Sequence, residues 1–519
     1  MGRRGDAFGP MNEGKITRRE LLAGGAGALA AGVLGGRLWR QLGTGASGTR
    51  VARSPRAAAD LGALRASPAS DGTTEALAVL GRSVLREPGS LPFPTLSAGT
   101  DTMPQVEHIV VLMMENHSYD NFLGMLGRGR GQRPRGDGFK IGANGLPTAS
   151  NPYGDGRVQH AFPMPTTCQL SSKPSQEWAA SHIQYAGGAN DGFVISPSGP
   201  VAMGYWTARD LPFTYSLAET FPVGDRWFCS VLGQTDPNRR YLIAATSSGM
   251  TDDISTSPSI GNAAQDALLA TPANGTIFDR LSEYGISWAD YAYSFPTGAT
   301  AELYPFDDAL NFAQKKTFDD FFSDAASGNL PGFCLLDPDY STQSQENPQN
   351  IVVGEACLSK VVQAVGSSPA WEKTLLVVVY DEHGGYYDHV PPPVALAPDL
   401  VPPVVAPGES AYDGFAHYGF RVPSIVVSPY ARRNYVTSVV HDHTSILAMV
   451  ERKWNLPALT YRDANANDLT DFLDMKAMAA RHPTFPELPA LAASGMSSST
   501  LACSVRGPGT IPPAWSVSG

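Results

Sequence analysis

Ionisable residues follow directly on the most hydrophobic stretch of the chain. In KTLLVVVYDEHGGYYDHVPPP, residues 373–393, the run from Leu375 to Tyr380 is typical of a buried strand. Two clusters of ionisable residues come next, namely Asp381, Glu382 and His383, and then, after two glycines and two tyrosines, Asp388 and His389. Carboxylates bind metal ions and imidazoles transfer protons, so the pattern indicates a site for chemistry at the end of this strand.

Two other apolar runs end in similar residues. Glu115 and Asn116 follow HIVVLMM, and Asp337 ends the run in GFCLLDPDY. One acidic residue at a strand end is usually a helix cap or a solvated turn, but three such ends predict convergence, because ligands bind outside the carboxyl ends of the strands in open α/β sheets. Carboxylate and amide oxygens suit a divalent cation, which also removes the repulsion between clustered carboxylates. The predicted ligands are Glu115, Asn116, Asp381 and Glu382.

A candidate nucleophile lies in GQTDPNRRYL, residues 233–242. Thr235 stands there in a glycine-containing turn just before a strand or a helix, beside Asn238 and Arg239. A hydroxyl held by a metal ion becomes a nucleophile. A purely structural turn is the other interpretation, and the residues alone favour neither.

The elements that must position these residues alternate along the chain. Continuous apolar runs, typical of strands covered on both faces, occur in HIVVLMMEN and at 240–246, 332–340, 374–383 and 421–431. Helix-like segments lie between and after them, at 355–365 and 442–455, and Asp442 is predicted to cap the second. This alternation predicts an α/β layered sheet.

Four segments together resemble a bacterial phosphoesterase family that includes haemolytic and non-haemolytic phospholipases C and an acid phosphatase. They are EHIVVLMMENHSYDNFLGML, CSVLGQTDPNRRYL, VVVYDEHGGYYDHVPPP and HDHTSILAMVERKWNLP. The resemblance implies an alkaline-phosphatase-like α/β fold with a central, mostly parallel sheet flanked by helices. It also implies one divalent metal ion, of unspecified identity, with Thr235 both as a ligand and as the nucleophile. The implied metal ligands are Glu115, Asn116, Thr235, Asp381 and Glu382.

Histidines are the natural proton donors for a leaving alcohol. Five of the ten histidines fall between 383 and 443, which is more than a uniform distribution along the chain would give. His389, and His182 in EWAASHIQYAGGANDGF, are the predicted residues for proton transfer or phosphate binding.

The chain departs from the family pattern at three positions where relatives often carry histidine. Gln176 stands in PSQEW, Asp236 in TDPNR and Asn347 in QENPQN. Because the predicted ligands and nucleophile are retained, hydrolysis is still expected. The absence of these three histidines is expected to affect protonation of the leaving group and head-group preference.

The beginning of the chain predicts export. KITRRELLAGGAGALAAGVLGG places Arg18 and Arg19 before small and apolar residues, as in a twin-arginine signal. A membrane anchor is the alternative, but the stretch is short and only weakly hydrophobic. Residues 1–45 are therefore predicted to be a signal region read by the twin-arginine machinery. The mature protein would be periplasmic, cell-wall associated or secreted.

Composition sets the remaining expectations. Residues 46–100 read as an Ala/Gly/Pro-rich linker or arm, 101–480 as the phosphoesterase catalytic domain and 481–519 as a peripheral tail. A net charge of −11 argues against a nucleic-acid partner. Five cysteines without CxxC pairs argue against a thiolate metal site and allow one or two disulfides.

The predicted function is that of an exported metal-dependent phosphoesterase with a threonine nucleophile, phospholipase C-like, acting on phospholipids at a membrane surface. An acid phosphatase acting on phosphomonoesters is the first alternative. A catalytically weak surface protein that binds phosphorylated lipid or glycan is the second. A sulfatase is disfavoured, because those enzymes start their C/S-x-P-x-R motif with Cys or Ser, where this chain has Thr235.

Overall fold

The computed structural model describes most of the chain from residue 71 onward. The described residues are 71–494 and 515–516, apart from 130, 169–173, 254–270, 294–299, 301–302, 305–310, 341 and 347–349. The expected signal region, 1–45, lies outside them, as do residues 46–70 of the expected linker.

One large sheet runs through the described part of the chain, in the strand order β12-β6-β11-β10-β1-β9-β7-β8. Strand β1 pairs in parallel with β10 and β9, and β7 pairs in parallel with β9 and β8. Strand β11 runs antiparallel to both of its neighbours. The sheet is therefore mostly parallel, as predicted. Its strands are β12 (Val436–Thr437), β6 (Val223–Gly224), β11 (Ser424–Val427), β10 (Thr374–Tyr380), β1 (His108–Met114), β9 (Phe333–Asp337), β7 (Trp288–Ala292) and β8 (Lys315–Thr317).

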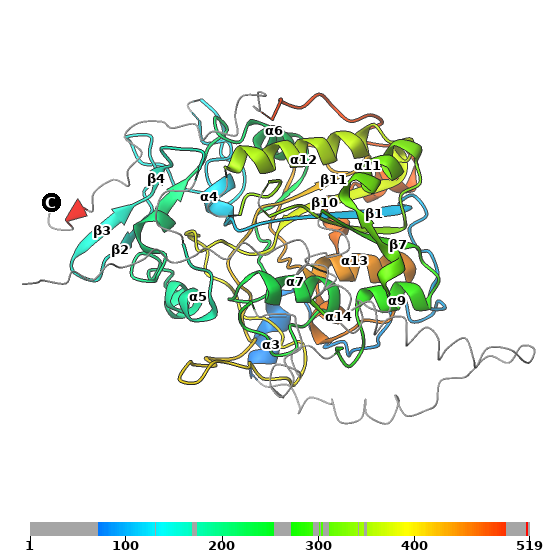
Figure 1. The fold of residues 1–519 in the computed structure, drawn as a ribbon, viewed down its shortest axis with the longest axis horizontal. Helices are drawn as coiled ribbons and strands as arrows, with labels where there is room; N and C mark the ends of the chain where they lie inside the picture. The colour runs from blue at the N-terminus through cyan, green and yellow to red at the C-terminus, as the bar shows by residue number, and fades with distance from the viewer. Residues whose placement is uncertain are drawn as a thin grey trace, which may run out of the picture. The chain divides into compact units, whose positions relative to one another are not determined.

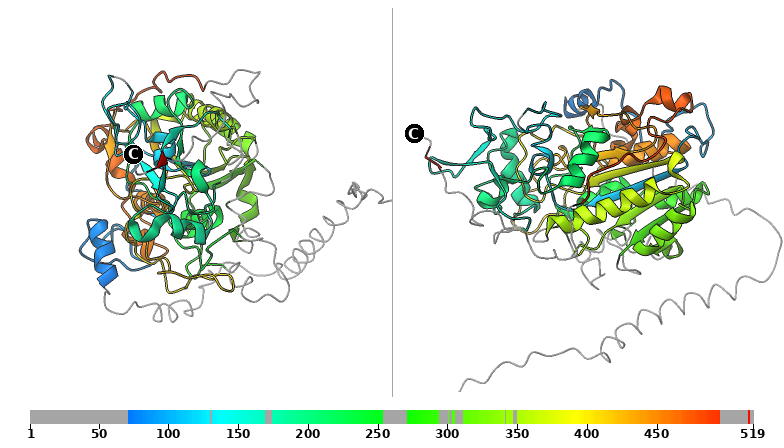
Figure 2. Two further views of the ribbon diagram at one scale, coloured as in Figure 1. Left: turned by 90° about the vertical axis from the view of Figure 1, so that its left-hand side faces the viewer. Right: turned by 90° about the horizontal axis from the view of Figure 1, so that it is seen from above.

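Helices cover both faces of this sheet (Figure 1). Helices α6, α11 and α12 lie along one face, and α12 lies over the sheet in the view from above (Figure 2). Helices α7, α9, α13 and α14 lie along the other face (Figure 1). This confirms the predicted layered α/β class. The bounds are α6 (Pro212–Thr220), α11 (Phe318–Ser327), α12 (Ile351–Gly366), α7 (Thr235–Ala244), α9 (Ile277–Glu283), α13 (Thr444–Trp454) and α14 (Tyr461–Asn465).

The central strands are continuous apolar runs because both of their faces are covered. Every residue of β10 is buried, and so is every residue of β1 after His108. The runs predicted at 332–340, 374–383 and 421–431 are confirmed as β9, β10 and β11.

The predicted strand at 240–246 is wrong. That segment continues helix α7, which begins at Thr235 and ends at Ala244. A short apolar run has the same composition in a buried helix and in a buried strand, so periodicity alone cannot separate them. Pro237 in the first turn and the acidic Asp236 beside it both suit a helix N-terminus.

The predicted cap of the helix at 442–455 is one residue off. Helix α13 begins at Thr444 with His443 in the cap position, and no side chain caps it. The Asp442 carboxylate instead accepts hydrogen bonds from Ser230 Oγ (2.9 Å) and Thr444 Oγ1 (2.5 Å). A tertiary contact thus takes the oxygen that a local cap would have used.

The described part of the expected linker, residues 71–100, packs on the rest of the described structure. Ala76 and Leu77 of helix α3 (Asp71–Val79) pack with Leu396, and Arg82 Nη2 donates to the Ala466 carbonyl at 2.6 Å. No described helix is long and apolar enough to cross a membrane.

Several other short helices and strands lie outside the large sheet. They are the helices α4 (Tyr119–Leu123), α5 (Trp178–Tyr185) and α15 (Met475–Ala479), the strands β2 (Ser150–Pro152), β3 (Arg157–His160) and β13 (Trp515–Ser516) of a small sheet, and the pair β4 (Phe162–Pro163) and β5 (Gly204–Tyr205).

One of the allowed disulfides is present. Cys168 is disulfide-bonded, whereas Cys229, Cys334 and Cys357 are free and buried. None of the free thiols is exposed for metal binding.

Candidate active site

The four ligands predicted from strand ends lie together at the carboxyl ends of β1 and β10. The parallel register pairs Met114 with Tyr380, so the residues that follow each strand are neighbours. The Asn116 amide donates to Asp381 Oδ1 at 3.0 Å, and the Glu382 amide donates to the same oxygen at 2.7 Å. The side chains of Glu115, Asn116, Asp381 and Glu382 are all buried. One strand register thus builds this group of four, called the carboxylate cage below.

Two special backbone positions shape the cage. Asn116 has a φ of 65°, in the left-handed region, where asparagine is tolerated better than most residues. Gly384 has a φ of 64°, and a Cβ atom there would lie 2.0 Å from the Asn116 carbonyl oxygen. The first glycine of DEHGG is therefore required by close approach of the two chain segments.

The predicted nucleophile is the first residue of helix α7, next to the cage. Thr235 Oγ1 lies 3.5 Å from Glu115 Oε2, and the side chain is only partly buried. A helix N-terminus carries a partial positive charge, which favours a phosphate group nearby. The structure therefore places all five residues of the implied metal set in one region.

A buried arginine, whose contacts the sequence did not predict, joins three strand ends. Arg239 Nη1 donates to Asp337 Oδ1 at 2.7 Å, and its Nε lies 3.3 Å from Asp381 Oδ2. Its Nη2 forms an ion pair with Glu115 Oε1. Thr235 and Arg239 are four residues apart on α7, so helical spacing would have placed both on one face had the segment been predicted as a helix.

The site carries more negative than positive charge. Four buried carboxylates, those of Glu115, Asp337, Asp381 and Glu382, face one guanidinium. Burial raises the pKa of Glu382, and the neighbouring Asp381 carboxylate raises it further. The same two causes raise the pKa of Glu115, against the opposing effect of Arg239. A cation bound here would relieve this cost.

Several polar atoms of the cage have no hydrogen-bond partner among the described residues. They are Asn116 Oδ1, Asn116 Nδ2 and Glu382 Oε1, all buried. Buried polar atoms are rarely left unpaired, so these atoms are suited to a ligand. Oxygen donors from three carboxylates, an amide and a hydroxyl are the kind of set that divalent cations prefer. The residues present therefore fit a divalent metal ion.

Two buried histidines contact residues of the cage. His443 Nε2 contacts the Asp381 carbonyl at 2.6 Å. His383 Nδ1 lies 3.2 Å from Glu382 Oε2, and its Nε2 contacts Gln184 Oε1 at 2.7 Å. Burial lowers the pKa of His383 to about 3, so its imidazole is neutral at ordinary pH. These two belong to the dense histidine group in the sequence, although neither was singled out.

The two histidines that were singled out make other contacts. His182, on α5, stacks on Tyr412 with ring centroids 3.9 Å apart, and its Nδ1 contacts the Trp178 carbonyl at 2.8 Å. His389 Nδ1 contacts Asp120 Oδ2 at 2.7 Å, and its Nε2 lies 3.2 Å from Asp137 Oδ1. None of these hydrogen bonds reaches the cage, and the roles of both histidines stay predictions.

A second group that could hold a metal ion surrounds His389. Asp120, Asp388 and His389 bring three ligand atoms close together. Arg421 forms ion pairs with both carboxylates of this group. Its Nε donates to Asp388 Oδ1 at 2.8 Å, and its Nη2 lies 3.3 Å from Asp120 Oδ1. Here one arginine pairs with both buried carboxylates, whereas in the carboxylate cage Glu382 has no arginine or lysine partner among the described residues.

Two of the three positions that depart from the family pattern lie in the described structure. Gln176 is buried, and its carbonyl accepts a hydrogen bond from Ser181 Oγ at 3.0 Å. The Asp236 amide donates to Asp253 Oδ1 at 2.7 Å, beside Thr235. Asn347 lies outside the described residues.

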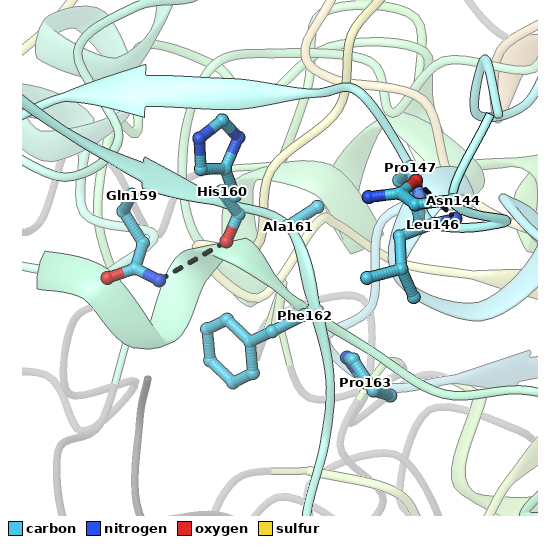
Figure 3. Close-up of a pocket in the computed structure, with 8 residues that line it drawn as sticks. All are labelled: Asn144, Leu146, Pro147, Gln159, His160, Ala161, Phe162 and Pro163. Atoms are coloured by element: carbon cyan, nitrogen blue, oxygen red, sulfur yellow. Dashed lines mark hydrogen bonds between the residues drawn. The ribbon is translucent and has the colours of Figure 1, made fainter. Parts of the chain in front are cut away.

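A separate pocket of about 410 Å³ opens between a loop and the small sheet (Figure 3). None of its lining residues is a predicted site residue. They are Asn144, Leu146, Pro147, Gln159, His160, Ala161, Phe162 and Pro163.

The solved structures to which this chain is similar share little sequence with it. One is a protein of the alkaline phosphatase superfamily from Vibrio parahaemolyticus, with a TM-score of 0.34 and 11% identity, covering 76% of this chain and 78% of that chain. Another is the lipoteichoic acid synthase LtaP from Listeria monocytogenes, with a TM-score of 0.29 and 9% identity, covering 72% and 79%.

The sequence relatives are more similar. Phospholipase C A of Mycobacterium tuberculosis (strain ATCC 25618 / H37Rv) is 31% identical over 410 residues, which is 71% of this chain and 77% of the relative. Non-specific phospholipase C3 of Arabidopsis thaliana is 29% identical over 442 residues, covering 76% and 79%. The model of the phosphoesterase family matches residues 106–457, a stretch that contains the whole carboxylate cage and Thr235. The chain therefore belongs to the phosphoesterase family.

Proposed function

We propose that this protein is a metal-dependent phosphodiesterase of the phospholipase C type. The observation that carries the proposal is the meeting of Glu115–Asn116 with Asp381–Glu382 beside the Thr235 hydroxyl. The names of the relatives, phospholipases C from mycobacteria and from a plant, support a phospholipid as the substrate.

The proposed reaction proceeds by two displacements at phosphorus. A divalent cation, when bound, would polarise the phosphoryl oxygens and lower the pKa of the Thr235 hydroxyl. Thr235 Oγ1 forms a bond to phosphorus while the bond from phosphorus to the diacylglycerol oxygen breaks, and the proton lost by Thr235 is balanced by the proton that the departing diacylglycerol oxygen takes up. Water then attacks phosphorus, releases the phosphorylated head group and restores the threonine.

The chain's own residues supply positioning and a proton acceptor. Glu115 Oε2 lies 3.5 Å from Thr235 Oγ1, so it can accept the threonine proton as the bond to phosphorus forms. The N-terminus of α7 stabilises negative charge on the phosphate.

A panel of phosphodiesters and phosphomonoesters, assayed with and without a chelator, tests this function. Hydrolysis of phosphatidylcholine vesicles that stops with chelator is the expected result. Turnover of phosphomonoesters alone would indicate the acid phosphatase. Binding of lipid without turnover of any phosphoester would indicate the surface binding protein.

We also propose that the protein leaves the cytoplasm by the twin-arginine route. The paired Arg18 and Arg19 before a weakly apolar stretch are the support for it. A lipid in a membrane is a substrate that an exported enzyme can reach.

A further inference from the structure

The guanidinium of Arg239 lies where three strand ends meet. Its partners are Glu115 after β1, Asp337 at the end of β9 and Asp381 after β10. The side chain is 1% exposed, and Nη1 also donates to Thr300 Oγ1 at 3.0 Å. Each group of the guanidinium therefore has a fixed polar partner, so Arg239 is held in place rather than swinging through the site.

Arg239 divides the oxygens of the two shared carboxylates. Glu115 turns Oε1 to Arg239 and Oε2 to Thr235. Asp381 turns Oδ2 to Arg239, while its Oδ1 accepts the amides of Asn116 and Glu382. In two-metal hydrolases, two cations a few ångströms apart share carboxylates in a similar way, one on each side. Here the second side is filled by a side chain.

We propose that Arg239 is a built-in second cation, which takes the place of a second metal ion and limits the cage to one. The proposal rests on the metal-dependent function above. The three carboxylates around Arg239 would otherwise form a site for a hard divalent cation of their own, because Asp337 adds a ligand that the cage does not use. Arg239 also fixes the orientation of Glu115 and Asp381 and, through one turn of α7, the distance from Thr235 to both.

The variant Arg239→Met tests this idea, because methionine keeps an unbranched chain and removes the charge. The matched control is Arg240→Met. Arg240 is the next residue of the same helix and is also buried, but it donates to the carbonyls of Ser247 and Leu303 and forms no ion pair with a carboxylate of the described residues. Both variants lose a buried arginine, but only Arg239→Met removes the cation that pairs with carboxylates of the cage.

The readout is the amount of Mn²⁺ bound per chain after equilibrium dialysis, measured by elemental analysis. Wild type and Arg240→Met should hold about one ion per chain, and Arg239→Met should hold about two. In chelator, Arg239→Met should unfold at a lower temperature than Arg240→Met, and Mn²⁺ should raise its midpoint more than that of the control.

The outcomes separate cleanly. One bound Mn²⁺ or none in Arg239→Met, with one in wild type, would overturn the proposal while leaving the metal-dependent function intact. No bound Mn²⁺ in wild type would instead remove the proposed function itself. If Arg239→Met folds only in the presence of Mn²⁺ and then carries two ions, the metal replaces the guanidinium, as proposed. Failure to fold with Mn²⁺ present would show that it cannot.

Discussion

The backbone amide of Asn116 donates to Asp381 Oδ1 at 3.0 Å, although the two residues are 265 positions apart in the chain. This hydrogen bond ties the turn after β1 to the turn after β10. The Asn116 side chain itself has no hydrogen-bond partner among the described residues.

Asp381→Asn should lose metal and activity together. The amide keeps an oxygen for the Asn116 and Glu382 amides but removes one ligand charge, so metal affinity should fall by about tenfold or more, and turnover with it. Elemental analysis and phosphodiester turnover measure both. The control is Glu355→Gln, a buried carboxylate that accepts from the amides of Phe213 and Thr214. An Asp381→Asn protein with full metal content would place the metal elsewhere.

Thr235→Val should keep the fold and lose about three orders of magnitude or more in turnover. Valine retains the β-branched shape and removes only the oxygen. Wild type quenched during turnover should carry a phosphoryl group on the peptide that contains Thr235, detectable by mass spectrometry. Thr246→Val is the control, since that hydroxyl donates to Asp399. Near-normal turnover of Thr235→Val would exclude covalent catalysis.

The metal-free protein should become less stable as the pH rises. Burial, with Asp381 next, raises the pKa of both Glu115 and Glu382 in the folded state. A carboxyl with a raised folded pKa contributes stability below its unfolded pKa and loses it as the pH rises through the folded value. In chelator, the unfolding midpoint should therefore fall as the pH rises above the ordinary glutamate pKa of about 4.3. Glu382→Gln should flatten this dependence, and an equally steep profile in that variant would contradict the assignment.

Gly384→Ala should destabilise the protein far more than an ordinary positive-φ glycine substitution. The added Cβ would lie 2.0 Å from the Asn116 carbonyl oxygen. Gly81 is the matched control, with a φ of 66° and nothing within 4 Å of the position that an added Cβ would take. We expect a loss of about 1 kcal/mol for Gly81→Ala and about 3 kcal/mol or more for Gly384→Ala, measured by urea unfolding. Equal losses would show that the close approach is relaxed at no cost.

Replacing Arg18 and Arg19 together with lysine should retain the protein in the cytoplasm. Lysine keeps the charge but loses the planar guanidinium, so a receptor that reads arginine pairs should discriminate against it. Cell fractionation of a producing strain measures the distribution. Unchanged export of the double variant would indicate another route.

Several features of the site could be predicted from the sequence because they depend on short segments. Residues that follow a buried strand must emerge at its carboxyl end, so Glu115–Asn116 and Asp381–Glu382 could be assigned to one edge of a parallel sheet. The motifs around these residues also indicated the phosphoesterase family. The helix at 235–244 could not be predicted in the same way, because a short apolar run fits a buried strand equally well.

The sequence by itself determined which residue types were available and which strand ends would present them. Only the tertiary structure decided which partners the buried charges and histidines take. Arg239 contacts three carboxylates. His383 and His443 contact Glu382 and Asp381 of the cage. His389 instead contacts Asp120 and Asp137. The physical reason is that the partner of a buried charge is chosen by the packing of segments far apart in the chain. Local propensity and spacing hold no information about that choice.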